Sequence, residues 1–184
     1  MMRRLQVAGQ DLLKVLGDVK AGELKAFENE ILNSNRIFVT GLGRTGLMAR
    51  GFAMRLMHLG RRVYHVGDVI TPAMRQGDLL IIGSRTGRSK VLQLFEEIGH
   101  QAKGRVAVVT ADPKSPVARK ADVVLTIDDR RVVEARKRRN EPYLPLGSLF
   151  EQAFLSVMDQ AVVDLMAALD LTERDLERIH TRFE

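Results

Sequence analysis

The segment Arg36-Ile-Phe-Val-Thr-Gly-Leu-Gly-Arg-Thr-Gly46 decides the fold of this chain. Its first half is a short run of β-branched and aromatic residues, which is typical of a buried strand. Three glycines follow within six residues, and a helical apolar pattern then runs from Leu47 to Leu59. A strand, a glycine-rich turn and a helix in this order predict the first unit of an α/β domain.

Four further short apolar runs predict four more strands. They are continuously apolar, which favours strands buried on both faces, and helical stretches separate most of them. The runs are Val63–Val66, Leu79–Ile82, Val106–Val109 and Val123–Leu125. We therefore expect an α/β fold, a three-layer αβα sandwich around a five-stranded parallel sheet of the flavodoxin-like kind.

The rest of the chain predicts extra helices at both ends of this sandwich. Residues 1–35 show apolar residues near helical spacing and are expected to form an N-terminal helical extension. A long helix is predicted from about Leu149 to Leu169, and a short one from Thr172 to about Thr181. The length of 184 residues suits one domain, and no linker divides it, so residues 1–184 are expected to form a single domain.

Composition excludes several classes of protein. The chain has no cysteine, so a disulfide, a thiolate zinc site and a cysteine nucleophile are all impossible. No apolar stretch reaches the roughly 18 residues of a membrane span, and the N-terminus lacks the apolar region of a signal peptide. These observations predict a cytoplasmic protein that does not associate with a membrane.

The net charge of +6 first suggests a nucleic-acid-binding protein. The excess is concentrated between Arg130 and Arg139, where six basic residues and one acid give a local charge of +5. This run lacks interleaved aromatic residues and follows a predicted strand. We therefore expect a solvated loop or an oligomer-facing segment here, and no nucleic-acid partner.

The glycine-rich turn after the first strand is compatible with three interpretations. Gly41-x-Gly43-x-x-Gly46 matches the dinucleotide fingerprint, with Asp68 as a candidate ribose-binding acid, but such turns also occur for geometric reasons alone. Arg44 and Thr45 place a cation and a hydroxyl inside the turn, which favours a different phosphate ligand.

A second loop follows the strand Leu79–Ile82 and precedes a helix. It contains three hydroxyls, two arginines and a glycine, which suit a phosphate bound at a helix N-terminus. The candidate binding residues are Ser84, Arg85, Thr86, Gly87, Arg88 and Ser89. The alternative is a simple helix cap, with Ser84 or Thr86 as the capping residue.

Longer motifs make a family resemblance specific. They are the glycine turn, Phe52-Ala-Met-Arg-Leu-Met-His-Leu-Gly60, Thr71-Pro72, Asp78-Leu-Leu-Ile-Ile-Gly-Ser84 and Pro145-Leu-Gly-Ser-Leu-Phe-Glu-Gln152. From about Arg36 to Glu184 the chain resembles the sugar isomerase (SIS) family, and within it the 6-phospho-3-hexuloisomerases. That resemblance implies isomerisation of D-arabino-hex-3-ulose 6-phosphate to fructose 6-phosphate, the step after formaldehyde fixation in the ribulose monophosphate pathway. It also implies no cofactor, no metal, and a homo-oligomer, either a tetramer or a dimer.

Position 85 departs from the family pattern, which reads Ser-Gly-Ser-Gly-x-Thr in this loop. Arg85 stands where the family has a glycine, while Thr86 and Ser89 keep their hydroxyls. An arginine here either adds a phosphate contact or fills the site, and the sequence leaves both possibilities open.

Two residues are candidates for the acid–base chemistry. Moving a ketone from C3 to C2 through an enediol needs a base, and the resemblance implies that Glu151 is that base. Ser148-x-x-Glu151 is also a capping-box pattern. The resemblance further implies that His180 opens the sugar ring or shuttles protons, reaching a neighbouring copy's pocket in an oligomer. Arg44 is expected to steady the enediolate or the phosphate, or to form only a surface salt bridge.

Other functions remain open at this point. The same fold serves isomerases of pentose and heptose phosphates, and it also serves non-catalytic modules that bind sugar phosphates. A pure binding module has no need of both Glu151 and His180, so their presence favours an enzyme. His58, His65 and His100 lack metal-ligand spacing and are expected to be structural.

Overall fold

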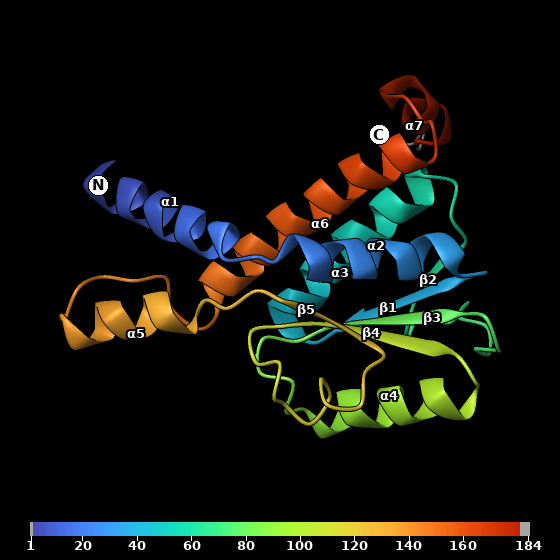
Figure 1. Cartoon of the computed structure of the whole chain (residues 1–184), viewed down its shortest axis with the longest axis horizontal. Helices are drawn as coiled ribbons and strands as arrows, with labels where there is room; N and C mark the ends of the chain where they lie inside the picture. The colour runs from blue at the N-terminus through green and yellow to red at the C-terminus, as the bar shows by residue number, and fades with distance from the viewer. Residues whose placement is uncertain (1, 181–184) are drawn as a thin grey trace.

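The computed structural model describes residues 2–180, with side chains from Arg4 onward. Five parallel strands form one sheet with the order β2-β1-β3-β4-β5 (Figure 1). The strands are β1 Ile37–Gly41, β2 Val63–His65, β3 Leu79–Gly83, β4 Arg105–Thr110 and β5 Val123–Thr126. Each agrees with a predicted apolar run to within one residue at either end.

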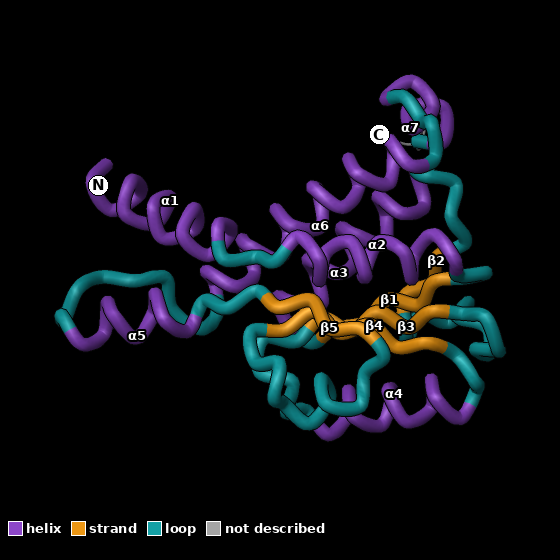
Figure 2. The backbone as a smooth tube through the Cα atoms, in the orientation of Figure 1, coloured by secondary structure: helices purple, strands orange, loops and turns teal. Residues whose placement is uncertain are grey.

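Helices cover both faces of the sheet, as Figure 2 shows, and the predicted three-layer sandwich is confirmed. α2, α3 and α6 lie on one face, while α4 lies on the other (Figure 1). The helices are α1 Met2–Gly17, α2 Ala21–Asn33, α3 Gly43–His58, α4 Lys90–Gln101, α5 Arg130–Arg138, α6 Ser148–Ala168 and α7 Glu173–Ile179. The predicted end of the last helix, Thr181, lies outside the described residues.

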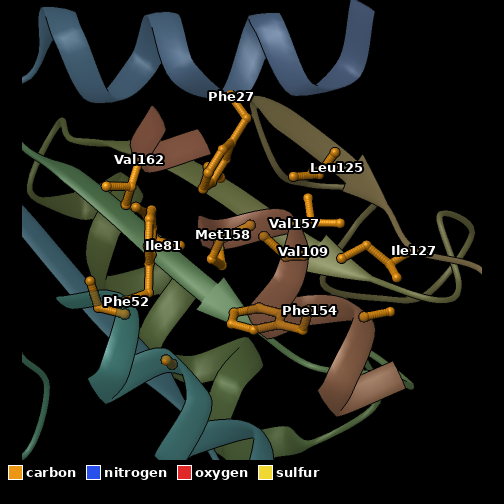
Figure 3. Close-up of a cluster of buried hydrophobic side chains, with 14 of the residues drawn as sticks. Phe27, Phe52, Ile81, Val109, Leu125, Ile127, Phe154, Val157, Met158 and Val162 are labelled. Atoms are coloured by element: carbon orange, nitrogen blue, oxygen red, sulfur yellow. The ribbon is translucent and has the colours of Figure 1, made fainter. Parts of the chain in front are cut away.

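The larger apolar core fills the space between the sheet and α2, α3 and α6 (Figure 3). α6 contributes Phe150, Phe154 and Met158, which are fully buried, and β3 contributes Ile81. α2 adds Phe27, so the N-terminal residues take part in the main core. A smaller core lies between the sheet and α4. Strands covered on both sides explain why the predicted runs are apolar at every position.

The basic run is a helix, and the prediction of a solvated loop is wrong at this point. Arg130–Arg138 forms α5. Its Arg136 donates from Nη2 to Asp11 of α1 at 2.9 Å and also forms an ion pair with Glu141. Val133 is buried. Asp11 and Glu141 therefore neutralise part of the positive charge of this segment and allow it to form a helix.

Among residues 2–180, no helix is both long enough and apolar enough to cross a membrane.

Glu96 is a buried acid in the α4 layer. It is fully buried (0% exposed) on the same helical face as Leu92, and neither carboxyl oxygen has a hydrogen-bond partner among the described residues. Burial raises the pKa of Glu96, and the positive charge of Lys120 opposes this effect only in part. The ionised form of Glu96 therefore destabilises the fold.

Replacing Glu96 by glutamine is expected to raise the free energy of unfolding by about 1–2 kcal/mol at pH 8. The pKa of Glu96 in the folded state lies above its value of about 4.3 in the unfolded state. The folded state therefore loses stability as the pH rises from the unfolded-state pKa through the folded-state pKa. The gain should therefore vanish near pH 4. Denaturant titrations at both pH values measure it. Glu97→Gln removes an exposed neighbour and should change little. Equal stability of Glu96→Gln and the parent chain at pH 8 would contradict the expectation.

Candidate active site

The sheet order places a topological switch point between β1 and β3. In open parallel sheets, ligands bind in the crevice at the carboxyl ends of the strands on either side of this point. The loops after β1 and β3 are the two glycine- and hydroxyl-rich segments predicted from the sequence. The fold therefore brings both candidate phosphate loops to one edge of the sheet.

The glycines of the first loop allow β1 and α3 to approach closely. A Cβ atom built on Gly46 would lie 2.5 Å from the carbonyl oxygen of Gly41, and one built on Gly41 would lie 3.1 Å from Gly46. α3 begins at Gly43, four residues earlier than predicted, and so includes Arg44 and Thr45 in its first turn. Close packing therefore explains Gly41 and Gly46. Arg44 lies in the first turn of α3, between these two glycines.

Arg44 joins α3 to the first turn of α6. Its Nε lies 3.0 Å from Oε2 of Glu151, and its Nη1 donates to Oγ of Ser148 at 3.1 Å. The Ser148 hydroxyl in turn donates to the carbonyl oxygen of Pro145 at 2.8 Å. The arginine side chain is 59% exposed, whereas the glutamate is only 6% exposed as a residue. The structure thus pairs the predicted base with the predicted oxyanion cation.

The Ser148–Glu151 capping box predicted as an alternative does not form. The N-cap of α6 is Gly147, with φ 87°, and the helix start has no side-chain cap hydrogen bond. Ser148 is instead the first helical residue. Oε2 of Glu151 receives no hydrogen bond from the described residues despite the nearby arginine, because the ion pair lacks hydrogen-bond geometry. A buried carboxylate oxygen with an unused lone pair is suited to accept a proton.

The second loop is held by backbone contacts with β4 and the segment after it. Its Ser84 N–H donates to the carbonyl oxygen of Val109 at 3.0 Å, and the carbonyl oxygen of Arg85 accepts from the Ala111 N–H at 3.1 Å. Gly87 has φ 58°, and a Cβ atom there would lie 2.0 Å from Oγ of Ser115. Glycine is therefore required at position 87 both for the backbone conformation and for space.

The three predicted hydroxyls have different environments. Oγ of Ser84 is buried and accepts from the Gly87 N–H at 3.1 Å, so it stabilises the loop itself. Ser89 is the N-cap of α4 but makes no side-chain cap hydrogen bond, and Thr86 is exposed. The alternative of a cap by Ser84 or Thr86 is wrong, since α4 begins only at Lys90. Thr86 and Ser89 are the hydroxyls left to meet a ligand.

The two arginines of this loop are paired with acids that the sequence analysis did not single out. Nε of Arg85 donates to both carboxyl oxygens of Asp129 at 2.9 Å, and Nη2 of Arg88 lies 3.4 Å from Asp112. Burial raises the pKa of Asp129, and the Arg85 hydrogen bond opposes this effect. Because Asp129 lies three residues after Thr126, the last residue of β5, the rule that ligands gather at strand ends could have identified it.

Three of these elements meet at Gly83. A Cβ atom there would lie 3.1 Å from the ring of Phe154 in α6 and 3.3 Å from the methyl group of Thr45 in α3. The end of β3, the start of α3 and the first turns of α6 therefore converge at one point. Thr45 is buried at this junction, so it packs rather than facing solvent.

His180 lies at the other end of α3 from this junction. Its ring stacks on the ring of His58, with centroids 5.0 Å apart. His58 is the last residue of α3 and Arg44 lies in its first turn, so the helix rise separates the two ends by about 20 Å. Within one chain the structure does not bring His180 to Glu151.

Asp68, the candidate ribose-binding acid, is occupied by protein contacts. Its carboxylate accepts from Nη2 of Arg50 at 2.9 Å, and this hydrogen bond lowers the pKa of Asp68. Nδ1 of His65 lies 3.6 Å from the same carboxylate, and burial lowers the pKa of His65. This cluster joins the loop after β2 to Arg50 of α3.

Comparison with known proteins identifies relatives along nearly the whole chain. The chain is 36% identical over 165 residues to the 3-hexulose-6-phosphate isomerase of Bacillus subtilis, covering 88% of this chain and 87% of the relative. It is 34% identical over 178 residues to the enzyme of the same name from Mycobacterium gastri, covering 97% and 87%.

A solved structure agrees with these relatives. A hypothetical protein from Methanococcus jannaschii, for which a function of 3-hexulose-6-phosphate isomerase was inferred, superposes with a TM-score of 0.85 at 26% identity, covering 99% of both chains. Residues 30–135 match the SIS domain family, and this range contains all five strands and both glycine-containing loops. The chain therefore belongs to the SIS domain family.

Proposed function

We propose that the protein isomerises D-arabino-hex-3-ulose 6-phosphate to fructose 6-phosphate. The Arg44–Glu151 pair carries this proposal, since it places a cation beside a buried carboxylate at the switch point of the sheet. The relatives named 3-hexulose-6-phosphate isomerase, at 34% and 36% identity, support this choice of sugar.

The chemistry proceeds through an enediol. The Glu151 carboxylate removes the proton from C2, and the electron pair of that bond forms the C2=C3 double bond as the C3 carbonyl becomes an enediolate oxygen. Arg44 stabilises the negative charge on this oxygen. The hydroxyl proton on the C2 oxygen passes to the C3 oxygen, and the protonated Glu151 returns its proton to C3, so that the C2 oxygen becomes the ketone and C3 carries the hydroxyl. No external oxidant or reductant is needed.

The phosphate group binds at the second loop in this proposal. Thr86 and Ser89 donate hydroxyl hydrogen bonds, backbone N–H groups near Gly87 face the anion, and the α4 N-terminus favours negative charge. Arg85 and Arg88 add positive charge at the same edge. The substrate thus lies with its phosphate near β3 and its ketone near the start of α6.

A coupled assay tests this function directly. Ribulose 5-phosphate and formaldehyde are combined with a hexulose-phosphate synthase, and fructose 6-phosphate is measured after addition of the purified protein. Formation of fructose 6-phosphate that depends on the protein supports the proposal. Consumption of a pentose or heptose phosphate instead, with no fructose 6-phosphate formed, would assign the site to a different sugar.

We further propose that His180 serves the site of a neighbouring copy in a homo-oligomer. The variants Glu151→Gln and His180→Ala should each lose activity, by at least about tenfold for His180→Ala. Co-expressed at equal levels, they should recover about one quarter of the activity of the parent chain, because half of random dimers contain one intact composite site out of two. Failure of the mixture to exceed both single variants would show that His180 does not act across an interface between copies.

A further inference from the structure

The chain from Asp129 to Gly147, called here the α5 arm, leaves the sandwich after β5 and returns to it at α6. Figure 1 shows α5 projecting from the body of the molecule on the same side as α1. Both ends of the arm lie beside the second loop, because Asp129 accepts a hydrogen bond from Arg85 and a Cβ atom built on Gly147 would meet the same arginine side chain. One side chain therefore touches the base of the arm at both of its ends.

The contact at the first end is an ion pair with a buried acid. Asp129 is 0% exposed, and both of its carboxyl oxygens accept from Nε of Arg85 at 2.9 Å. The contact at the second end is steric. A Cβ atom on Gly147 would lie 3.0 Å from Cδ of Arg85, so the aliphatic part of the arginine passes directly over this glycine. Gly147 is the N-cap of α6, four residues before Glu151.

We propose that Arg85 and Asp129 are positioning residues that close the base of the α5 arm and thereby fix the first turn of α6, which carries Glu151. The inference rests on the proposed function for its effect on turnover. It also gives a role to the arginine that replaces the glycine of related loops. Arg85 acts through Glu151 in this account, and Asp129 acts through Arg85.

The main chain of the second loop does not depend on this side chain. The carbonyl oxygen of Arg85 is held by the Ala111 N–H at 3.1 Å and by the Thr110 hydroxyl at 3.2 Å. Shortening the side chain at position 85 therefore leaves the loop attached to β4 and loosens the arm at its base, while Arg136 of α5 still pairs with Asp11. Without Arg85, the buried Asp129 loses its counter-charge, which weakens the first end of the arm further.

Amide hydrogen exchange tests the positioning without requiring knowledge of the substrate. In Arg85→Gly and in Asp129→Asn, protection of the hydrogen-bonded amides of Ser148, Glu151 and Val133 should fall at least tenfold, while the amides of β1 and β3 keep theirs. Arg88→Gln is the matched control, because it removes an arginine of the same loop whose partner is Asp112. Unchanged protection at the start of α6 in both variants would overturn the proposal, whatever sugar the protein uses.

Steady-state kinetics then separate positioning from direct contact with the substrate. Asp129→Asn should lower kcat at least tenfold with little change in KM. In a chain that already carries Arg85→Gly, the same substitution should lower kcat less than twofold. An equal loss of kcat in both backgrounds would show that Asp129 does not act through Arg85. If Arg85→Gly raises KM and leaves kcat unchanged, Arg85 is a phosphate ligand, and this result would also overturn the proposal. If the parent chain forms no fructose 6-phosphate, the proposed function fails, while the exchange experiment still decides the positioning.

Discussion

Replacing Glu151 by glutamine is expected to reduce kcat for hexulose 6-phosphate isomerisation by about 10²–10⁴-fold, the usual contribution of a general base. Glutamine has nearly the same shape but cannot accept the C2 proton at neutral pH. Folding should be preserved, because Arg44 is 59% exposed and can be solvated when its partner loses its charge. Binding of fructose 6-phosphate, measured by calorimetry, should be largely retained.

Asp159→Asn is the matched control for this variant. It removes an exposed carboxylate from the same helix, two turns beyond Glu151, and should leave the rate unchanged. Thermal unfolding of both variants checks that the fold is intact. A rate for Glu151→Gln near that of the parent chain, with product formation confirmed, would end the assignment of Glu151 as the base.

Replacing Gly46 by alanine is expected to lower the free energy of unfolding by about 2–3 kcal/mol, because an added methyl group overpacks the contact between β1 and α3. The new Cβ atom would lie 2.5 Å from the carbonyl oxygen of Gly41, which is backbone and cannot rotate away. α3 must therefore move outward at its first turn, and Arg44 moves with it. Turnover should fall together with stability.

Denaturant titration measures the loss of stability, which corresponds to roughly 5–10 °C in melting temperature for a chain of this size. Gly51→Ala is the matched control. It adds the same methyl group to the same helix, but the nearest atom is a side-chain carbon of Leu155 at 4.0 Å. This control should be neutral or stabilising by up to about 1 kcal/mol, since alanine favours a helix more than glycine does. Equal stability of Gly46→Ala and Gly51→Ala would show that the close approach is not required.

Hydrophobic patterning was sufficient to locate the strands. Parallel strands covered on both faces must be apolar at every position, and this local property appears directly in the sequence. The sequence predicted that α3 begins at Leu47, four residues after its observed start at Gly43. Glycines are poor helix formers, and the close contact with β1 is what favours glycine in this first turn. α5 was not predicted as a helix, because Asp11, which pairs with Arg136 of this helix, lies 125 residues away in the sequence.

The candidate site divides in the same way. The sequence by itself predicted the two loops at strand ends, because glycines, hydroxyls and their order after a strand are local features. The role of Glu151 as a base followed from the family resemblance and stays a prediction. Tertiary structure alone decided that Arg44 meets Glu151, that Arg85 is held by the buried Asp129, and that His180 lies against His58. These pairs join residues from different elements. Their distances are set by how the sheet order and the helix packing close the chain, and no local pattern encodes that closure.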